Sequence, residues 1–374
     1  MKNKTIFSES ENSKIISGWN HSHFSEELDL YTFQPVKNYF YRCVSGDEEG
    51  IAKENWFEDW LIKTYLKDKI PVANCLTLCC GHGERDRRLA KMGVFKNCLG
   101  LDISPGAIEA CKINASNEKF NNLKYATADL NKDSLKRNAY DLIYVGGGMH
   151  HILNLEHLVD EIYLSLKPGG LLVCDEYIGP SYNDLSNRHR EIINSAIHLI
   201  PKRLRNATEQ NFIPNYWRRS TLKNMIYVIS NSRSFNFEKY EVSSMWPSYK
   251  KRIFNFGKKI LKIISKYQNK SNNFKYGQVF DVCPEIVKSG DPSEGVRSDE
   301  IVPIIKQKFK NTNTHYYNGS ILSYALDKKF FLNFNSELKQ DSNLLNLLID
   351  LEKNTISSNE IPPVLGIIVS QKEH

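Results

Sequence analysis

Residues Leu76 to Ala90 read LTLCCGHGERDRRLA, and this stretch decides the fold. A short apolar run enters a Cys-Gly-His-Gly turn, and a charged segment of helical composition follows it. Gly81 and Gly83 can adopt positive φ and have no Cβ, so the backbone can approach a ligand while the N–H groups of the following helix point at it. The stretch therefore predicts a strand, a turn that cradles a nucleotide-type ligand, and a helix.

A second apolar run, LGLDIS from Leu99 to Ser104, supports this interpretation because it contains an acidic residue near its end. Asp102 follows the glycine turn by about twenty residues, the separation at which dinucleotide-binding folds place a carboxylate on the ribose hydroxyls. A carboxylate can accept two hydroxyl hydrogen bonds. Asp102 could instead cap the next helix, a role for which Ser104 competes because it directly precedes Pro105.

Further segments follow in an order that is typical of one family. They are ATADL, which places Asp129 after a third strand, YDLIYVGGGMHHI (Tyr140 to Ile152), LKPGG (Leu166 to Gly170) and LLVCDEYIGP. Together with the glycine turn, these segments resemble the class I S-adenosylmethionine-dependent methyltransferases. The resemblance implies an α/β, Rossmann-like fold with a mostly parallel sheet and a last antiparallel strand, and S-adenosylmethionine as the cofactor.

The same resemblance implies which residues bind the donor. Gly81 and Gly83 would lie beside its methionine portion, Asp102 at the ribose and Ile103 along the adenine. The remaining implied positions are Thr77, Cys79, Asp129, Leu130 and Gly146.

Thr77 departs from the family pattern, because an acidic residue usually stands there, and Glu84 is a candidate substitute. Cys79 replaces the usual first glycine. Cys79 and Cys80 are neighbours, so on a strand they would point to opposite faces, and no partner pair lies nearby. We therefore interpret both as small buried side chains and predict no metal site.

Two histidines in the loop after the predicted fourth strand are candidates for a general base. The imidazoles of His150 and His151 titrate near neutral pH, which suits deprotonation of a hydroxyl acceptor. Glu176 and Tyr177 end the predicted fifth strand, at the same edge of the sheet. We predict that His150, His151 or Glu176 takes part in catalysis and that Tyr177 contacts the acceptor. The alternative is that one histidine caps the loop or packs within it and that Glu176 makes a structural hydrogen bond.

Residues 1–70 are predicted to form a helical cap that is rich in aromatic side chains, ahead of and including the helical stretch EGIAKENWFEDWLIKTYL. Such a segment can close over the donor and exclude water. Trp19 and Tyr31 are the candidate acceptor contacts. Packing of the aromatic group beneath the sheet is the alternative.

The rest of the chain divides by composition. Residues 71–180 are predicted to form the S-adenosylmethionine-binding core, residues 181–300 a helical, basic and aromatic insertion that faces the substrate, and residues 301–374 the strands and helix that complete the sheet. The stretch 248–278 holds nine Lys or Arg residues and no acidic ones. It could contact an anionic membrane surface, a phosphorylated acceptor or nucleic acid, or form a solvated helix face, which we favour; nucleic acid is disfavoured.

The composition is that of a globular enzyme. The chain has 374 residues, 41% of them hydrophobic, and eight cysteines without the spacing of a disulfide or zinc framework. A polar start and the lack of a long apolar run predict a soluble, cytoplasmic protein. The sequence thus predicts methyl transfer to a small molecule, with oxygen in a sugar or secondary metabolite favoured. The alternatives are a nitrogen or sulfur acceptor, an RNA or protein substrate, and a non-catalytic S-adenosylmethionine-binding protein.

Overall fold

The computed structural model describes residues 6–20, 33–201, 203–204, 218–219, 279–280, 284–326, 334–335 and 337–374. Tyr31 and the basic stretch 248–278 lie outside the described residues. The acceptor contact predicted for Tyr31 and the surface contacts predicted for 248–278 therefore stay predictions.

A seven-stranded sheet in the order β3-β2-β1-β4-β5-β9-β8 organises the protein. Its strands are β1 (Val72–Leu78), β2 (Phe95–Asp102), β3 (Leu123–Thr127), β4 (Tyr140–Gly146), β5 (Leu166–Tyr177), β8 (Asn311–Asn318) and β9 (Leu365–Gln371). The strands from β1 to β5 pair in parallel, whereas β9 runs antiparallel to both β5 and β8. The predicted Rossmann-like fold is confirmed, including the antiparallel strand in VLGIIVS. A separate pair joins β6 (Arg218–Arg219) to β7 (Val279–Phe280).

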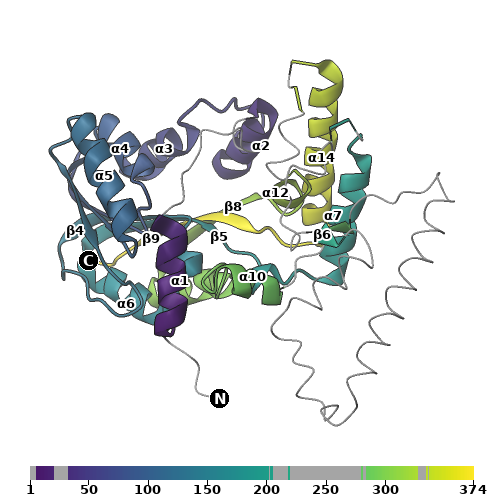
Figure 1. Ribbon diagram of the computed structural model, residues 1–374. Helices are drawn as coiled ribbons and strands as arrows, with labels where there is room; N and C mark the ends of the chain where they lie inside the picture. The colour runs from purple at the N-terminus through teal and green to yellow at the C-terminus, as the bar shows by residue number, and fades with distance from the viewer. Residues whose placement is uncertain are drawn as a thin grey trace, which may run out of the picture.

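Helices connect the parallel strands and cover the sheet (Figure 1). The connecting helices are α4 (Glu84–Lys91), α5 (Pro105–Asn117) and α6 (Leu155–Ser165). The N-terminal ones are α1 (Glu9–Asn20), α2 (Gln34–Ser45) and α3 (Trp56–Leu61), the last continued by a π-helical turn, Ile62–Leu66. The later ones are α7 (Asn187–Leu199), α10 (Pro284–Gly290), α11 (Ile301–Lys308), α12 (Leu322–Ala325) and α14 (Lys339–Ser357). Short 3-10 turns span Met149–His151 (η3), Ser181–Asn183 (η4) and Ser298–Glu300 (η6).

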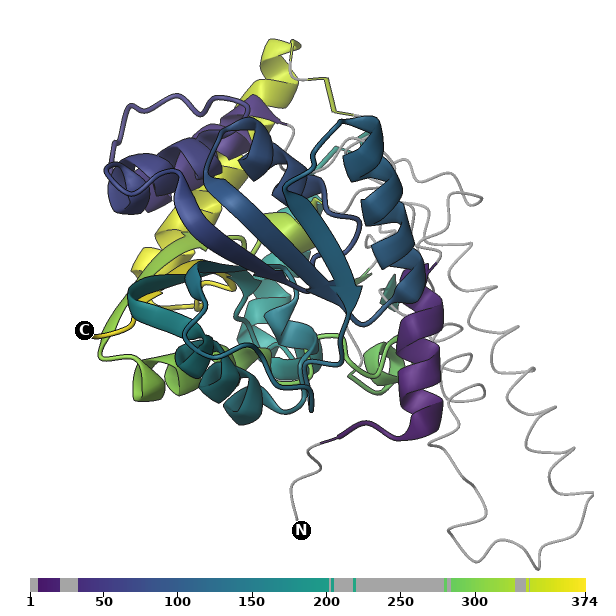
Figure 2. The same ribbon diagram turned by 90° about the vertical axis from the view of Figure 1, so that its left-hand side faces the viewer.

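The alternation of side chains along each strand divides the core into two layers. On β4, Leu142 and Tyr144 pack into one hydrophobic cluster, and Ile143 and Val145 pack into the other. The first cluster includes side chains of α2, α3, α4, α5, α7 and α14, and the second includes those of α6 and α11. Figures 1 and 2 show these two sets of helices on opposite sides of the sheet. Because both faces are covered there, the central strand β4 is apolar on both sides, whereas the edge strand β8 is polar.

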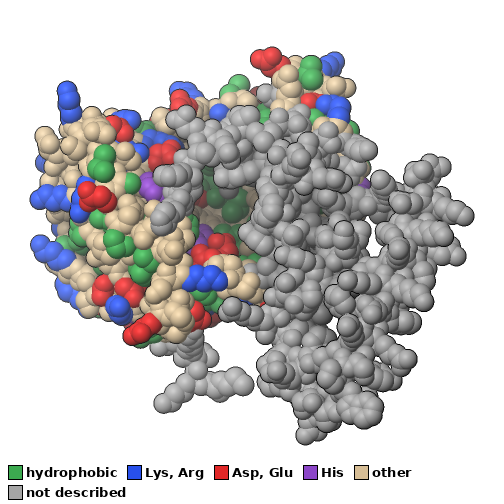
Figure 3. Space-filling model, in the orientation of Figure 1, with side chains coloured by type: hydrophobic (Ala, Val, Ile, Leu, Met, Phe, Trp, Pro, Cys, Tyr) green, Lys and Arg blue, Asp and Glu red, His purple; other side chains and the backbone are tan. Residues whose placement is uncertain are grey.

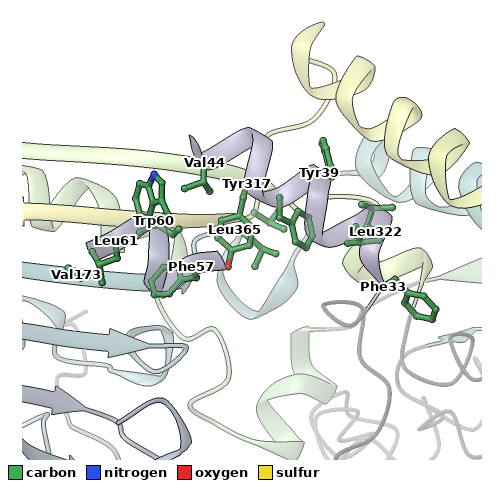
Figure 4. Close-up of a cluster of buried hydrophobic side chains, with 14 of the residues drawn as sticks. Phe33, Tyr39, Val44, Phe57, Trp60, Leu61, Val173, Tyr317, Leu322 and Leu365 are labelled. Carbon is green, nitrogen blue, oxygen red and sulfur yellow. The ribbon is translucent and has the colours of Figure 1, made fainter. Parts of the chain in front are cut away.

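The N-terminal aromatic residues divide between the core and the sheet edge. Phe33, Tyr39 and Phe57 point into the first hydrophobic cluster, together with Trp60 (Figure 4). Trp19 instead lies on α1, which contacts α5 and crosses the edge of the sheet. The packing interpretation therefore holds for Phe33, Tyr39, Phe57 and Trp60, whereas the lid stays a prediction.

Element boundaries differ from the expected ones where local signals are weak. The LKPGG turn is included in β5, where the register with β4 shifts and Gly169 has a φ of 75°. Within the region 301–374 that was expected to complete the sheet, β8 ends at Asn318, after which the chain turns into α12. The expected helix before β1 begins only at Trp56.

Surface charge is mixed on the described part of the protein. On the face drawn in Figure 3, Lys and Arg side chains lie among acidic ones. Among the described residues, no helix combines the length and the apolar character needed to cross a lipid bilayer.

Candidate functional site

A cavity of about 660 Å³ opens where β1, β2 and β4 end. This is the edge at which open α/β sheets bind ligands. Its lining combines the glycine turn, the residues after β2, β3 and β4, and one side of α1. Of the predicted site residues, the lining contains Trp19, Cys79, Gly81, Asp102, Ile103, Asp129, Leu130, Gly146 and His151.

The turn after β1 depends on left-handed backbone conformations. Cys79, Gly81 and Gly83 have φ values of 51°, 52° and 69°. A Cβ on Gly83 would lie 2.8 Å from the Tyr125 hydroxyl, so this position requires glycine. Gly81 has open space around it and lines the cavity, whereas Gly83 packs against Tyr125 and shapes the turn from behind.

Asp102 joins the glycine turn to the end of β2. Its Oδ2 accepts a hydrogen bond from the Gly81 N–H at 2.9 Å, and its Oδ1 accepts one from the Ser104 N–H at 2.9 Å. Ser104 itself caps α5, because its hydroxyl accepts the Ala107 N–H. Burial raises the pKa of Asp102. The carboxylate therefore organises the cavity wall, and its remaining lone pairs are available to a ligand.

Asp129 and Leu130 form the neighbouring wall after β3. Asp129 Oδ1 accepts the Asn131 N–H at 3.1 Å, and its other oxygen pairs with Lys132 at 3.2 Å. Leu130 is buried and belongs to the second hydrophobic cluster. The Asp129 carboxylate and the apolar Leu130 side chain thus lie side by side. The carboxylate suits the polar edge of an adenine, and the leucine suits its face.

Thr77 lies away from the cavity. Its side chain is buried on β1, with Oγ1 4.0 Å from Cys98 Sγ. The buried acid next to Thr77 comes from α4: Asp86 is buried, and burial raises its pKa to about 7. Glu84, the expected substitute, is exposed at the cavity rim and pairs with Arg88. The expected contact of Thr77 with the donor is therefore wrong, because Thr77 lies on the face of β1 that α4 covers.

Cys79 is a partly buried side chain at the cavity wall, whereas its interpretation from the sequence was a small buried residue. Its thiol donates to the Gly148 carbonyl at 3.5 Å, and a Cβ on Gly148 would lie 2.2 Å from the Cys79 Cβ. Burial raises the pKa of the Cys79 thiol well above its ordinary value. The protonated thiol and Gly148 therefore hold the ends of β1 and β4 in close contact.

Glu176 organises the loop after β4. Its Oε1 accepts the N–H groups of Gly148 and Met149 at 2.8 and 2.6 Å, and its Oε2 lies 2.8 Å from His150 Nδ1. The Glu176 side chain has no exposed surface. With both oxygens engaged, Glu176 positions His150 and the loop; this corrects its expected direct part in catalysis.

His151 reaches the cavity. Its ring meets the Trp19 ring edge to face, with centroids 5.2 Å apart, and its Nδ1 lies 3.0 Å from Ser293 Oγ. Desolvation by burial lowers the pKa of His151 well below its ordinary value. Desolvation also lowers the pKa of His150, but Glu176 more than offsets this and the net direction is upward. The two neighbours therefore differ: the cavity holds a neutral imidazole, and a more basic one lies behind it.

The sequence of this region is similar to that of known proteins. A family model described as a methyltransferase domain matches residues 76–174, which contain the glycine turn, Asp102, Asp129 and the histidine loop. Residues 76–174 therefore match a methyltransferase domain, which agrees with the resemblance of this part of the chain to the class I S-adenosylmethionine-dependent methyltransferases. The match is consistent with S-adenosylmethionine as the expected cofactor.

Curated relatives of this methyltransferase match the same region. The demethylmenaquinone methyltransferase of Lactococcus lactis is 28% identical over 124 residues, which cover 33% of this chain and 49% of the relative. The ubiquinone/menaquinone biosynthesis C-methyltransferase of Zymomonas mobilis is 27% identical over 127 residues, covering 34% and 50%. The chain thus spans about half the length of the curated relatives it matches.

Among solved structures, an S-adenosylmethionine-dependent methyltransferase from Mesorhizobium loti is 26% identical. It covers 28% of this chain and 46% of its own, with a TM-score of 0.26. The family assignment rests on the sequence match of the methyltransferase domain.

Tyr177 lies away from the methyltransferase cavity. Its hydroxyl donates to the Pro180 carbonyl at 3.1 Å and lies 3.3 Å from the Tyr324 hydroxyl. Several lining residues were not predicted from the sequence, among them Arg85 and Ser293. Arg85 pairs with Glu58 at 3.1 Å, so it ties α4 to α3. No local pattern marks Ser293, because packing alone brings it to His151.

Proposed function

We propose that this methyltransferase transfers the methyl group of S-adenosylmethionine to a small molecule that binds beside His151, with oxygen as the favoured acceptor atom. One observation carries the proposal: the His151 imidazole lines the same cavity as most of the donor positions implied by the resemblance, among them Gly81 and Asp102. A cavity of about 660 Å³ is in the size range of small-molecule sites. This size favours a small acceptor over an RNA or protein substrate.

The donor would occupy the side of the cavity formed by the glycine turn. Gly81 would adjoin its methionine portion and Asp102 its ribose, while Asp129 and Leu130 would contact the adenine. The Asp102 carboxylate is already aligned by two backbone N–H groups, so binding requires little reorganisation.

The acceptor would occupy the side closed by α1 and the histidine loop. Trp19 covers His151 there, and Asn20 fixes the end of α1 by accepting hydrogen bonds from the Ser104 hydroxyl at 2.7 Å and the Gly106 N–H at 2.9 Å. The sulfonium makes the methyl group electrophilic, so the enzyme mainly has to align an acceptor lone pair with the carbon–sulfur bond and keep water out.

Oxygen is favoured because a hydroxyl acceptor benefits from an adjacent imidazole. His151 has its pKa held low by desolvation, so it stays neutral and can accept a hydrogen bond from the acceptor hydroxyl. The names of the curated relatives refer to quinone substrates and to a carbon acceptor. A quinone-related ring with an enolic or phenolic oxygen is therefore a reasonable first test compound.

The test is calorimetric titration of the full-length protein with S-adenosylmethionine and S-adenosylhomocysteine, followed by mass detection of methylated products in a metabolite extract. Donor binding and a new product that carries the methyl group on oxygen would support the proposal. A product methylated on carbon, nitrogen or sulfur would refute the acceptor atom, and a methylated RNA or protein would refute the acceptor class. Donor binding without turnover on any acceptor would favour a non-catalytic binding protein.

A further inference from the structure

Two histidines and a glutamate meet beside the acceptor side of the cavity. His150 and His151 belong to η3, and Glu294 lies between α10 and η6. One potential metal-binding atom from each of the three residues lies within 4.8 Å of the other two. His151 Nε2 is 3.8 Å from Glu294 Oε2.

Hydrogen bonding orients His150 for binding through Nε2. Its Nδ1 lies 2.8 Å from Glu176 Oε2, and the Glu176 carboxylate has no exposed surface. Since a carboxylate only accepts, Nδ1 carries the proton and Nε2 remains to bind a cation. A carboxylate behind a ring nitrogen is the usual support of a metal-binding histidine.

His151 is oriented in the same way by a different partner. The Ser293 hydroxyl donates its one hydrogen to Asp291 Oδ1 at 2.6 Å. Ser293 Oγ must therefore accept the hydrogen bond that joins it to His151 Nδ1 at 3.0 Å. His151 thus also keeps its proton on Nδ1, and its Nε2 has a lone pair on the side of Glu294.

The segment that carries Glu294 is attached to the histidine loop. The Val296 N–H donates to the His150 carbonyl at 3.0 Å, and the Tyr182 N–H donates to the Gly295 carbonyl at 2.7 Å. These backbone hydrogen bonds flank Glu294, so its position relative to the imidazoles is fixed by the fold. A preorganised set of ligands of this kind can bind a metal ion without a large rearrangement.

The charge around the two imidazoles is negative. Glu176, Asp291 and Glu294 contribute three carboxylates, and in the part of the chain that the structure describes Asp291 and Glu294 make their ion-pair contacts with His151. Crowded carboxylates repel one another unless a cation lies between them. A divalent ion would satisfy this requirement.

We propose that His150, His151 and Glu294 bind a divalent transition-metal ion, of which Zn²⁺ is the simplest candidate, and that an acceptor oxygen occupies its open coordination position. Two imidazoles and a carboxylate are a ligand set of catalytic zinc sites with a further position left open. His151 and Ser293 line the donor cavity, so an oxygen held by the metal would lie beside the methyl donor. The sequence analysis missed this site because its ligands come from two distant segments.

The acceptor role of the metal rests on the proposed methyl transfer, whereas metal binding does not. With the metal bound, His151 Nε2 would be a ligand and would no longer accept the hydrogen bond of the acceptor hydroxyl. The metal-bound O–H would instead lose its proton to water, because a metal ion lowers the pKa of a bound hydroxyl. The oxygen lone pair then forms the O–CH₃ bond, and the electron pair of the broken C–S bond goes to sulfur. The products are the methyl ether and neutral S-adenosylhomocysteine.

The first test is metal binding by the full-length protein without an affinity tag, after removal of bound metals with a chelator. Competition of Zn²⁺ with a chromogenic chelator is expected to show one high-affinity ion per chain. His151→Gln and Glu294→Gln should each weaken this binding by roughly 100-fold. His157→Gln is the matched control, because His157 is not part of the cluster and its Nε2 lies 3.2 Å from the Asp133 carbonyl oxygen.

Co²⁺ substitution is a second readout that does not depend on activity. A visible absorption band that diminishes in Glu294→Gln but persists in His157→Gln would support the site. Failure of the wild type to bind a stoichiometric ion, or unchanged Zn²⁺ affinity in both cluster variants, would overturn it.

Donor calorimetry separates this inference from the proposed function. If Zn²⁺ binds at the cluster but S-adenosylmethionine does not bind, the proposed function fails and the metal site stands. If the donor binds and the acceptor oxygen is methylated at the same rate with and without metal, the proposed function stands and the acceptor role of the metal is refuted.

Discussion

The two sides of the cavity are built differently. On the donor side, each important group directly follows a strand: Gly81 follows β1, Asp102 ends β2 and Asp129 follows β3. On the acceptor side, the His150–His151 pair is oriented by Glu176 from β5 and by Ser293 from a segment much later in the chain. The donor side is thus set by strand order, whereas the acceptor side depends on long-range packing. Substitutions on the two sides should therefore have separable effects.

Glu176→Ala is expected to give the largest effect, and on the acceptor side. The change leaves the Gly148 and Met149 N–H groups and His150 Nδ1 without their buried carboxylate. The free energy of unfolding should fall by about 3 to 5 kcal/mol. Urea unfolding measures this loss. Glu176→Gln, which keeps the volume and one accepting oxygen, should lose less; equal stability of Glu176→Ala and wild type would show that the loop is held by other contacts.

The buried Asp86, behind the donor side of the cavity, should make the free energy of unfolding depend on pH. Burial raises its pKa to about 7, so the folded state holds a proton that the unfolded state releases near pH 4. Stability from this group therefore falls as the pH rises from about 4 to 7, by up to about 4 kcal/mol. Asp86→Asn should remove this contribution, so its stability relative to wild type should increase between pH 5 and pH 8. Urea unfolding curves at both pH values test this, and a constant difference would contradict it.

Asp102→Ala should weaken donor binding without affecting the histidine side. Loss of the carboxylate removes its hydrogen bonds to the donor and to the Gly81 N–H, at a cost of about 1 to 3 kcal/mol in binding. Calorimetry with S-adenosylhomocysteine measures the change, with Asp68→Asn as an exposed control. Unchanged affinity in folded Asp102→Ala would remove this residue from the donor site.

Trp19→Ala should have the smallest effect on binding, and it tests whether the donor and acceptor sides of the cavity are separable. Loss of the edge-to-face contact with His151 is worth about 0.5 to 1.5 kcal/mol. We expect a several-fold rise in the KM for the acceptor and a smaller change in donor affinity, with Trp19→Phe closer to wild type. A larger effect on donor binding than on the acceptor KM would place Trp19 on the donor side.

Sequence reasoning succeeded where a residue's position follows from the strand that precedes it. Gly81, Asp102 and Asp129 line the cavity because parallel strands bring their carboxyl ends to one edge. It was less successful where the direction of a side chain decides its role. Thr77 faces α4, Glu176 is enclosed by the loop it supports, and Tyr177 bonds to Pro180. A one-residue step along a strand reverses the face, and a pattern of residue types does not reveal which face a helix will cover.

The sequence by itself determined the class of fold, the methyl-donor family and the donor turn, because glycine conformations and strand periodicity are local properties. Tertiary structure decided the acceptor side. Asp86 came to lie beside Thr77, and Ser293 and Glu294 came to lie beside the histidines, through contacts between segments far apart in the chain. Such contacts arise from the packing of whole helices and loops, so no short stretch of sequence contains them.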